Sequence, residues 1–174
     1  MEQRLMEIGD AEALSRFYLR NTDHLLPWEP KKESDFHSVN SWSRRLQDRA
    51  AEFESGASAH FLSYDPSTDE IVATCSITNI ARGPFQAGNI GYAVCKGSEG
   101  KGLMKQLCQY AIQFAFDELA LHRVMANYMP CNHRSEALLN RLGFEREGLA
   151  RKYLCINGKW EDHVLTSLVN SCNT

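Results

Sequence analysis

Residues 90–106 read Ile-Gly-Tyr-Ala-Val-Cys-Lys-Gly-Ser-Glu-Gly-Lys-Gly-Leu-Met-Lys-Gln. In this stretch an apolar, strand-like run reaches a loop with glycines at positions 97, 100 and 102, and a helical pattern follows. Glycine permits positive φ angles and lets a ligand approach the main chain closely. The junction directs backbone N–H groups and the positive end of a helix toward one point, which favours an anion such as a phosphate. The stretch therefore predicts a strand, a loop and a helix that hold a cofactor with a diphosphate group.

Two common nucleotide-binding loops do not fit this stretch. A Walker loop requires Ser or Thr after the Gly-Lys pair, but Lys101 is followed by Gly102. A dinucleotide fingerprint requires a third glycine three residues after the second, and that position is Lys105. An ordinary turn without a ligand stays open as the alternative.

The overall composition is that of one globular domain spanning residues 1–174. Hydrophobic residues make up 43% and charged residues 24%, and the net charge of −3 argues against general affinity for nucleic acids. No apolar run approaches the roughly 20 residues of a membrane-spanning helix. The six cysteines are scattered without a Cys-x-x-Cys pair. This usage predicts buried, reduced thiols in a cytoplasmic protein and no metal site.

The hydrophobic pattern predicts an α/β (α+β) domain in which strands outnumber helices. Residues 25–30 contain two prolines and are predicted to form a loop with an aromatic anchor. Asp10 is expected to cap the first helix, Gly143 to end the last one, and Asn157-Gly158 to turn a hairpin. The predicted strands are 2–8, 59–64, 71–80, 88–95, 122–129, 144–156 and 160–169. The predicted helices are 11–20, 34–54, a helix after 102, and 132–142.

A second informative segment covers residues 122–136. Its strand breaks at Pro130, and Asn132 occupies the position of a helix N-cap. Ser135 then falls at the third helical position, facing back toward the end of the strand. Capping alone for Asn132, and simple solvent exposure for Ser135, are the alternatives to ligand contact.

Taken together, the two segments resemble the GNAT superfamily of N-acetyltransferases. The superfamily has a glycine-rich acetyl-CoA loop at the start of a helix, matched here by residues 97–102. It also has an Asn, a short helix and a Leu-Gly-Phe in that order, matched by residues 132–144. The RimJ/RimL branch of ribosomal-protein N-terminal acetyltransferases is more similar still, through residues 27–30, 122–135 and 157–166. These matches span nearly the whole chain.

The resemblance implies a single GNAT domain, with a mixed, mostly antiparallel twisted sheet of about seven strands flanked by helices. Two parallel strands of that sheet are expected to splay near residues 93–95, where the N–H of Val94 would polarise the thioester carbonyl. Acetyl-CoA is the expected co-substrate. The residues assigned to bind it are Ala93, Val94, Cys95, Glu99, Gly100, Lys101, Gly102, Leu103, Met104, Asn132 and Ser135.

Three positions depart from the family pattern. Gly97 replaces the usual Gln or Arg of the loop, so no side chain there assists the diphosphate. Asn89 stands where a strand-borne glutamate base is common, and Leu139 where many members have a tyrosine acid. In the RimL-like branch a serine is thought to protonate the departing thiolate, and Ser135 matches that serine.

The general base does not carry over from this resemblance, because the glutamate proposed as base in the RimL-like branch maps near Leu154. Glu29 is the preferred general base, because its loop is expected to overhang the acceptor site. The other candidates are Glu161, Asp162 and His163. An α-amino group titrates at about 7.7–8.0, so a carboxylate acting through one water is sufficient. The residues expected to bind the acceptor are Trp28, Tyr92, Asn127, Tyr128 and Trp160.

The sequence thus predicts an acetyl-CoA-dependent N-acetyltransferase. The acceptor is the N-terminal α-amine of a ribosomal protein, with alanine first, and the amine attacks the thioester directly. Ribosome association and a homodimer are what relatives suggest. Two alternatives remain open: a small-molecule amine acetyltransferase, and a non-catalytic acetyl-CoA-binding factor for ribosome assembly.

Overall fold

The computed structural model describes residues 1–171. Within them a seven-stranded sheet has the order β1-β2-β3-β4-β5-β7-β6. All neighbouring strands are antiparallel except β4 and β5, which are parallel. The strands are β1 (Glu2–Leu5), β2 (Ala59–Asp65), β3 (Glu70–Ala81), β4 (Ala87–Val94), β5 (Arg123–Tyr128), β6 (Glu145–Ile156) and β7 (Lys159–Val169). The helices are α1 (Ala11–Arg20), α2 (Thr22–Leu25), α3 (Val39–Glu54), α4 (Leu103–Asp117) and α5 (His133–Leu142), with short 3-10 turns η1 (Ile8–Asp10), η2 (Leu26–Trp28) and η3 (Lys96–Ser98). The predicted mixed sheet is confirmed.

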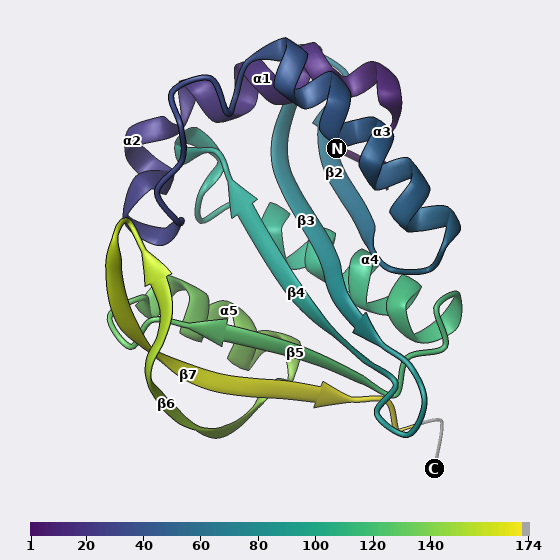
Figure 1. Cartoon of the computed structure of the whole chain (residues 1–174), viewed down its shortest axis with the longest axis vertical. Coiled ribbons are helices and arrows are strands. Elements are labelled where there is room, and N and C mark those ends of the chain that lie inside the picture. The colour runs from purple at the N-terminus through teal and green to yellow at the C-terminus, as the bar shows by residue number, and fades with distance from the viewer. Residues whose placement is uncertain (172–174) are drawn as a thin grey trace.

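Helices cover the sheet on two sides. On one side α4 and α5 bury a core that joins Leu107 and Leu139 to Phe61 and Ile77 of the strands. On the other side α1 and α3 enclose a second core around Trp42. Figure 1 shows α4 and α5 behind the strands, with α1 and α3 along the opposite side. The polar faces of these helices point to solvent, as an amphipathic pattern requires.

The parallel pair β4–β5 is short and then opens into a wedge. Pairing covers only Ala87–Asn89 against Arg123–Met125. Beyond it β4 continues along β3 and β5 continues along β7, and Figure 1 shows the two strands diverging. At the paired end an added Cβ on Gly88 would lie 2.9 Å from Ile77 Cγ2. This close packing explains a glycine inside a strand. The predicted splay is present, but it begins at Ile90 and not at residues 93–95.

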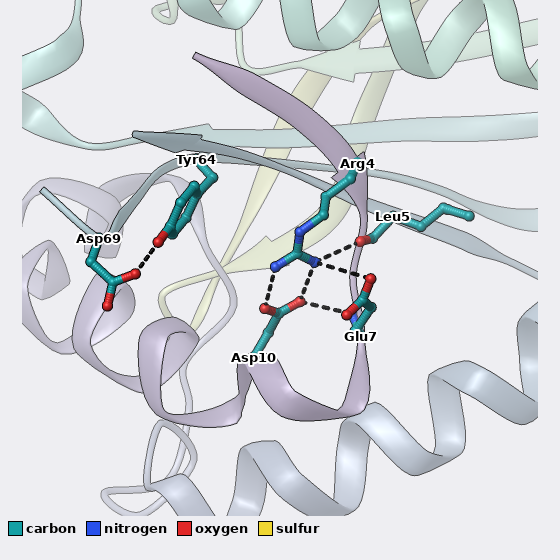
Figure 2. A network of polar contacts seen from close by, with 6 residues as sticks. All are labelled: Arg4, Leu5, Glu7, Asp10, Tyr64 and Asp69. Atoms are coloured by element: carbon teal, nitrogen blue, oxygen red, sulfur yellow. Dashed lines mark hydrogen bonds and ion pairs between the residues drawn. The ribbon is translucent and has the colours of Figure 1, made fainter. Parts of the chain in front are cut away.

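A partly buried ion pair holds the N-terminal segment, as Figure 2 shows. Arg4 donates to both carboxylate oxygens of Asp10, at 2.7 and 2.8 Å, and Glu7 N donates to Asp10 Oδ2 at 2.7 Å. The bond to Asp10 raises the pKa of Arg4 above its ordinary value. The helix predicted over 11–20 is confirmed, and Asp10 does precede it. However, its side chain makes no capping bond to α1, because Arg4 and Glu7 occupy the carboxylate.

Two predicted boundaries were wrong. The helix predicted from residue 34 begins at Val39, where Ser38 Oγ accepts the N–H of Ser41 at 3.2 Å and sets the start. The strand predicted over 2–8 ends at Leu5, because η1 follows it. The loop predicted over 25–30 also contains the end of α2 and the turn η2.

The C-terminal half agrees closely with the sequence. Gly143 ends α5 with a φ of 87°, and Asn157-Gly158 turns the β6–β7 hairpin with φ angles of 45° and 82°. Cys75, Cys95 and Cys108 are buried free thiols, whereas Cys131 and Cys155 are exposed. The sixth cysteine, residue 172, lies outside the described residues.

Candidate active site

The first part of the site is the loop between β4 and α4. Gly102 occupies the N-cap position with a φ of 78°, and no side chain caps the helix. Gly100 also has a positive φ, of 73°. Because the first N–H groups of a helix lack intrahelical partners, those of residues 103–105 are available to an anion. An added Cβ at either glycine would meet no atom within 4 Å, so backbone angles, not crowding, demand glycine here.

Buried polar contacts hold this loop in place. Asn21, which is 4% exposed, accepts the N–H of Lys96 through its Oδ1 at 3.0 Å and donates to Phe17 O at 2.8 Å. Cys95 Sγ donates to Ser98 Oγ at 3.1 Å. The loop is thus anchored from its N-terminal side, leaving its glycines facing outward. No sequence motif contains Asn21, which was not among the predicted site residues.

Glu99 connects the loop to two other elements. Arg134, at the start of α5, donates to Glu99 Oε1 at 2.5 Å, and His24 Nε2 of α2 lies 3.4 Å from the same oxygen. The carboxylate of this predicted cofactor-binding residue is therefore engaged within the protein, on the side of the site where α5 begins. Arg134 was not predicted to have a role.

The second part of the site is the open edge of β4. Ala93 and Cys95 pack toward α1 and α3, whereas Tyr92 and Val94 pack toward α4 and α5. Cys95 N donates to Val72 O of β3 at 2.9 Å. Since alternate backbone groups of a strand point to opposite edges, the N–H of Val94 points to the edge where β5 has left. The polarising group expected at Val94 thus has the required direction.

The third part is the start of α5. Asn132 Oδ1 accepts the N–H of Ser135 at 3.1 Å, so the predicted N-cap is confirmed. Ser135 is 6% exposed, and its Oγ lies 2.5 Å from the hydroxyl of Tyr92. Burial raises the pKa of Tyr92 well above its ordinary value, and the bond to Ser135 offsets only part of that shift. Ser135 therefore has a protonated phenol as its direct neighbour.

The predicted base lies on the loop after η2. The Glu29 carboxylate pairs with Lys32, and the Glu29 carbonyl accepts the N–H of Asn157 at 2.9 Å. This last bond joins the loop to the tip of the β6–β7 hairpin. Trp28 and Trp160 lie on these two segments and are 40% and 62% exposed. Two of the expected acceptor-binding residues are therefore surface aromatics on joined segments.

The structure does not gather the expected acceptor residues on one face. Tyr128 belongs to the core beneath α5, and its hydroxyl donates to Glu136 at 3.3 Å. Asn127 directly precedes Tyr128 in the same strand, so it points to the opposite face, where its Nδ2 contacts Tyr153 Oη at 3.5 Å. Tyr153 also packs against the ring of His163. The sequence did not single out Tyr153, because its pairing with Asn127 arises only when β6 folds across β7.

The chemistry of the site suits an organic diphosphate. The first turn of α4 has no side-chain cap, and Lys101 and Lys105 flank it in the sequence. Among residues 1–171, no group of three or more His, Cys, Asp or Glu side chains is placed to hold a metal ion. None of the helices in that range is both long and apolar enough to cross a bilayer.

Comparisons with known proteins agree with this geometry. The family model described as acetyltransferase (GNAT) domain matches residues 3–145. The ribosomal protein uS5-alanine N-acetyltransferase of Escherichia coli (strain K12) is 41% identical over 165 residues, covering 95% of this chain and 85% of that protein. The crystal structure of the ribosomal-protein-S5-alanine acetyltransferase from Vibrio fischeri matches with a TM-score of 0.94 at 40% identity, covering 97% of this chain and 92% of that one.

A further solved structure bears on the ligand. Mycobacterium smegmatis RimJ, solved in complex with CoA-disulfide, matches with a TM-score of 0.88 at 31% identity, covering 98% of this chain and 82% of that chain. The family match covers most of the sequence, and the fold, the glycine loop and the wedge are those that the motifs predicted. The chain therefore belongs to the GNAT family of acetyltransferases.

Proposed function

We propose that this protein transfers the acetyl group of acetyl-CoA to the N-terminal α-amine of a ribosomal protein that begins with alanine. One observation carries the proposal: the uncapped start of α4 and the Ser135 hydroxyl both border the β4–β5 wedge. The relative from Escherichia coli, named for this activity on uS5, supports the choice of acceptor.

The residues on the donor side have separable roles. Acetyl-CoA supplies an acetyl group activated as a thioester. Backbone N–H groups of residues 103–105 hold its diphosphate, and the freed N–H of Val94 polarises the carbonyl. Ser135 donates a proton to the departing sulfur. Asn132 keeps Ser135 in place by capping α5. None of these roles requires a charged side chain inside the wedge.

The acceptor amine needs only modest help. With a pKa of about 7.7–8.0, roughly a tenth of an α-amine is already neutral at pH 7. In the proposal Glu29 removes the remaining proton through a water molecule. For that step its carboxylate must exchange Lys32 for the incoming ammonium group. In the absence of substrate, the Lys32 ammonium group thus occupies the position beside Glu29 that the substrate ammonium group takes in the proposal.

The charge of the α3 layer disfavours a polyamine as the acceptor. Arg45 and Arg49 both lie over the ring of Trp42, with their guanidinium carbons 3.7 and 5.0 Å from its centroid. Among residues 1–171 neither has an acidic partner within 4 Å. A slot for a multiply charged cation would be expected to show carboxylates in place of unpaired guanidinium groups.

The proposal is tested by offering the purified protein acetyl-CoA together with three acceptor classes. These are peptides that begin with alanine, the same peptides with a blocked N-terminus, and polyamines. We expect acetylation of the free alanine peptides only, measured by mass spectrometry, and loss of that signal with Ser135→Ala. Ribosomal proteins from cells with and without the gene should differ by one acetyl group at a single N-terminus.

Other results would overturn the proposal. Acetylation of polyamines alone would identify a small-molecule enzyme. Tight binding of CoA without transfer to any amine, together with unaltered ribosomal N-termini, would identify a non-catalytic binding factor.

A further inference from the structure

The contact between Tyr92 and Ser135 crosses the wedge. Tyr92 lies on β4, three positions beyond Asn89, the last residue of β4 that pairs with β5. Ser135 lies on α5, which follows β5 in the chain. Their hydroxyl oxygens are 2.5 Å apart. This side-chain hydrogen bond thus joins the two arms at a level where the backbone ladder has ended.

The chemistry of the two hydroxyls sets the direction of this bond. Each has one hydrogen, so one must donate and the other accept. A phenol is more acidic than an aliphatic alcohol and its oxygen is a poorer acceptor, since the ring withdraws lone-pair density. Burial also raises the pKa of Tyr92, which keeps its proton in place at neutral pH. Tyr92 is therefore the donor, and Ser135 Oγ is the acceptor.

Because Tyr92 donates in this bond, the hydroxyl hydrogen of Ser135 is not used in it. Two other helical hydroxyls donate back to a carbonyl one turn earlier: Thr22 to Tyr18 O and Ser43 to Val39 O, both at 3.0 Å. In the part of the chain that the structure describes, the hydrogen bond of the Ser135 hydroxyl is the one with Tyr92. Its hydrogen is not bound to a helical carbonyl.

We propose that Tyr92 is a positioning residue that aims the Ser135 hydroxyl hydrogen at the sulfur of CoA. The inference rests on the proposed function. In the step, the amine nitrogen forms a bond to the acetyl carbon, the carbon–sulfur bond breaks, and its electron pair goes to sulfur. Sulfur takes the Ser135 proton, and Ser135 Oγ recovers a proton from the new ammonium group through water. Tyr92 keeps its own proton and stabilises the negative charge that develops on Ser135.

The first test titrates the thiol of bound CoA, with no acceptor present. The ultraviolet absorbance of the thiolate is followed against pH for the wild type, Tyr92→Phe, Ser135→Ala and the double variant. We expect wild-type protein to hold about ten times more thiolate than free CoA at the same pH, a shift of about one pKa unit. Each single variant should lose this excess, and the double variant should lose no more.

Two further proteins control for structural damage. Tyr18→Phe removes another buried phenol that bonds a hydroxyl, Thr74 Oγ1 at 3.1 Å, on the other side of the sheet. It should leave the thiol titration unchanged. Substituting 3-fluorotyrosine for Tyr92 keeps the ring and makes the phenol a stronger donor. It should increase the thiolate fraction, whereas Tyr92→Phe should decrease it. Structural damage to the site would not produce such an increase.

The second test is kinetic. With an alanine peptide, Tyr92→Phe and Ser135→Ala should each lower kcat by about 10- to 100-fold, with the KM for acetyl-CoA changed less than threefold. Additive losses, or a Tyr92→Phe enzyme with an unchanged thiol titration, would overturn the role of Tyr92 while leaving the acetyltransferase intact. A wild-type protein that fails to bind CoA would instead reject the proposed function itself.

Discussion

The two sides of the β4–β5 wedge are built from different parts of the chain. In the proposed function the donor side is backbone, supplied by residues 97–105 and fastened by the buried side chain of Asn21. The proposed acceptor side consists of two surface segments, the η2 loop and the β6–β7 hairpin, which expose Trp28 and Trp160. One side offers N–H groups that every sequence possesses, and the other offers particular side chains.

In the proposed function, this difference separates the binding of the acetyl donor from the choice of acceptor. A cradle of main-chain groups depends on φ angles, so it tolerates change in its side chains but not in Gly100 and Gly102. Surface aromatics contribute little to the folded core and are free to change without unfolding the sheet. We therefore expect donor-side substitutions to abolish cofactor binding, and acceptor-side substitutions to alter partner affinity.

The largest effect is expected from Gly102→Asp. The new carboxylate would lie at the N-cap of α4, where it competes with the diphosphate for the helical N–H groups and repels its charge. The affinity for CoA, measured by calorimetry, should fall about 100-fold or more. Aspartate is a favourable capping residue, and it tolerates a positive φ better than most residues do. The protein should therefore stay folded.

A matched substitution separates charge from strain in that result. Gly102→Asn introduces a side chain of the same shape without the charge, and it should weaken CoA binding by about tenfold or less. Equal losses for the two variants would mean that the helix start is not an anion site, and the comparison between the two sides would fail.

Trp160→Ala should produce the next largest effect, on the acceptor side alone. Exposed aromatics that contact a partner commonly contribute 1–2 kcal/mol, so the KM for the alanine peptide should rise about tenfold. CoA affinity should not change. Leu149→Ala is the control, because Leu149 is an exposed apolar residue of β6 that pairs with Val164, away from the hairpin tip. If both variants behave alike, the hairpin has no specific acceptor role.

Local backbone features of the molecule were predictable from the sequence, whereas contacts between distant residues were not. The glycine loop, the Asn132 cap and the Asn157-Gly158 hairpin were predictable, because each depends on residue types that a local backbone shape requires. The contacts of Asn21 with Lys96, and of Tyr92 with Ser135, join residues that are 75 and 43 positions apart. No local pattern encodes such pairs, which arise only when the sheet assembles.

The predicted start of the α3 helix was wrong because a periodic pattern does not fix where a helix begins. The apolar spacing of Phe36, Val39 and Trp42 is compatible with a helix that starts at either Ser34 or Ser38. The structure starts the helix at Val39, where Ser38 Oγ caps the N–H of Ser41. Arg45 of this helix also holds the preceding segment, because its Nη2 donates to Phe36 O at 2.6 Å and its guanidinium lies over the Phe36 ring. These contacts of the segment before the helix come from tertiary packing, which a periodic pattern does not contain.

Glu29→Gln should have a smaller effect that depends on pH. The α-amine is largely neutral above pH 8 and largely protonated below pH 7, so the need for a base grows as the pH falls. We expect kcat/KM to be within twofold of wild type at pH 8.5 and about fivefold lower at pH 6.5. A pH-independent loss would contradict the role of Glu29. The same profile in Glu161→Gln, whose carboxylate pairs with Lys159 at 2.8 Å, would place the base on the hairpin instead.

The smallest expected effect is a pH-dependent change in the free energy of unfolding, which must be separated from the pH dependence of kcat/KM. His60 lies on β2, away from both sides of the wedge, and burial together with the nearby Arg49 lowers its pKa from 6.5 to about 3. Glu52, 3.8 Å from His60 Nε2, does not offset this. Since the folded state resists protonation, the unfolded state binds more protons below pH 6.5, and stability falls as the pH falls. At pH 5.5 the loss should be about 1–2 kcal/mol relative to pH 8.

His60→Gln tests this assignment, because glutamine keeps a polar group near Ser58 Oγ, which contacts His60 Nε2 at 3.1 Å. The free energy of unfolding, from urea titrations at pH 8 and pH 5.5, should change less in this variant than in the wild type. An equal change would assign the acid sensitivity to other groups. Because His60 titrates in the folded protein only near pH 3, it adds nothing to the kinetics between pH 6.5 and 8.5. A loss of turnover in that range is therefore not due to His60.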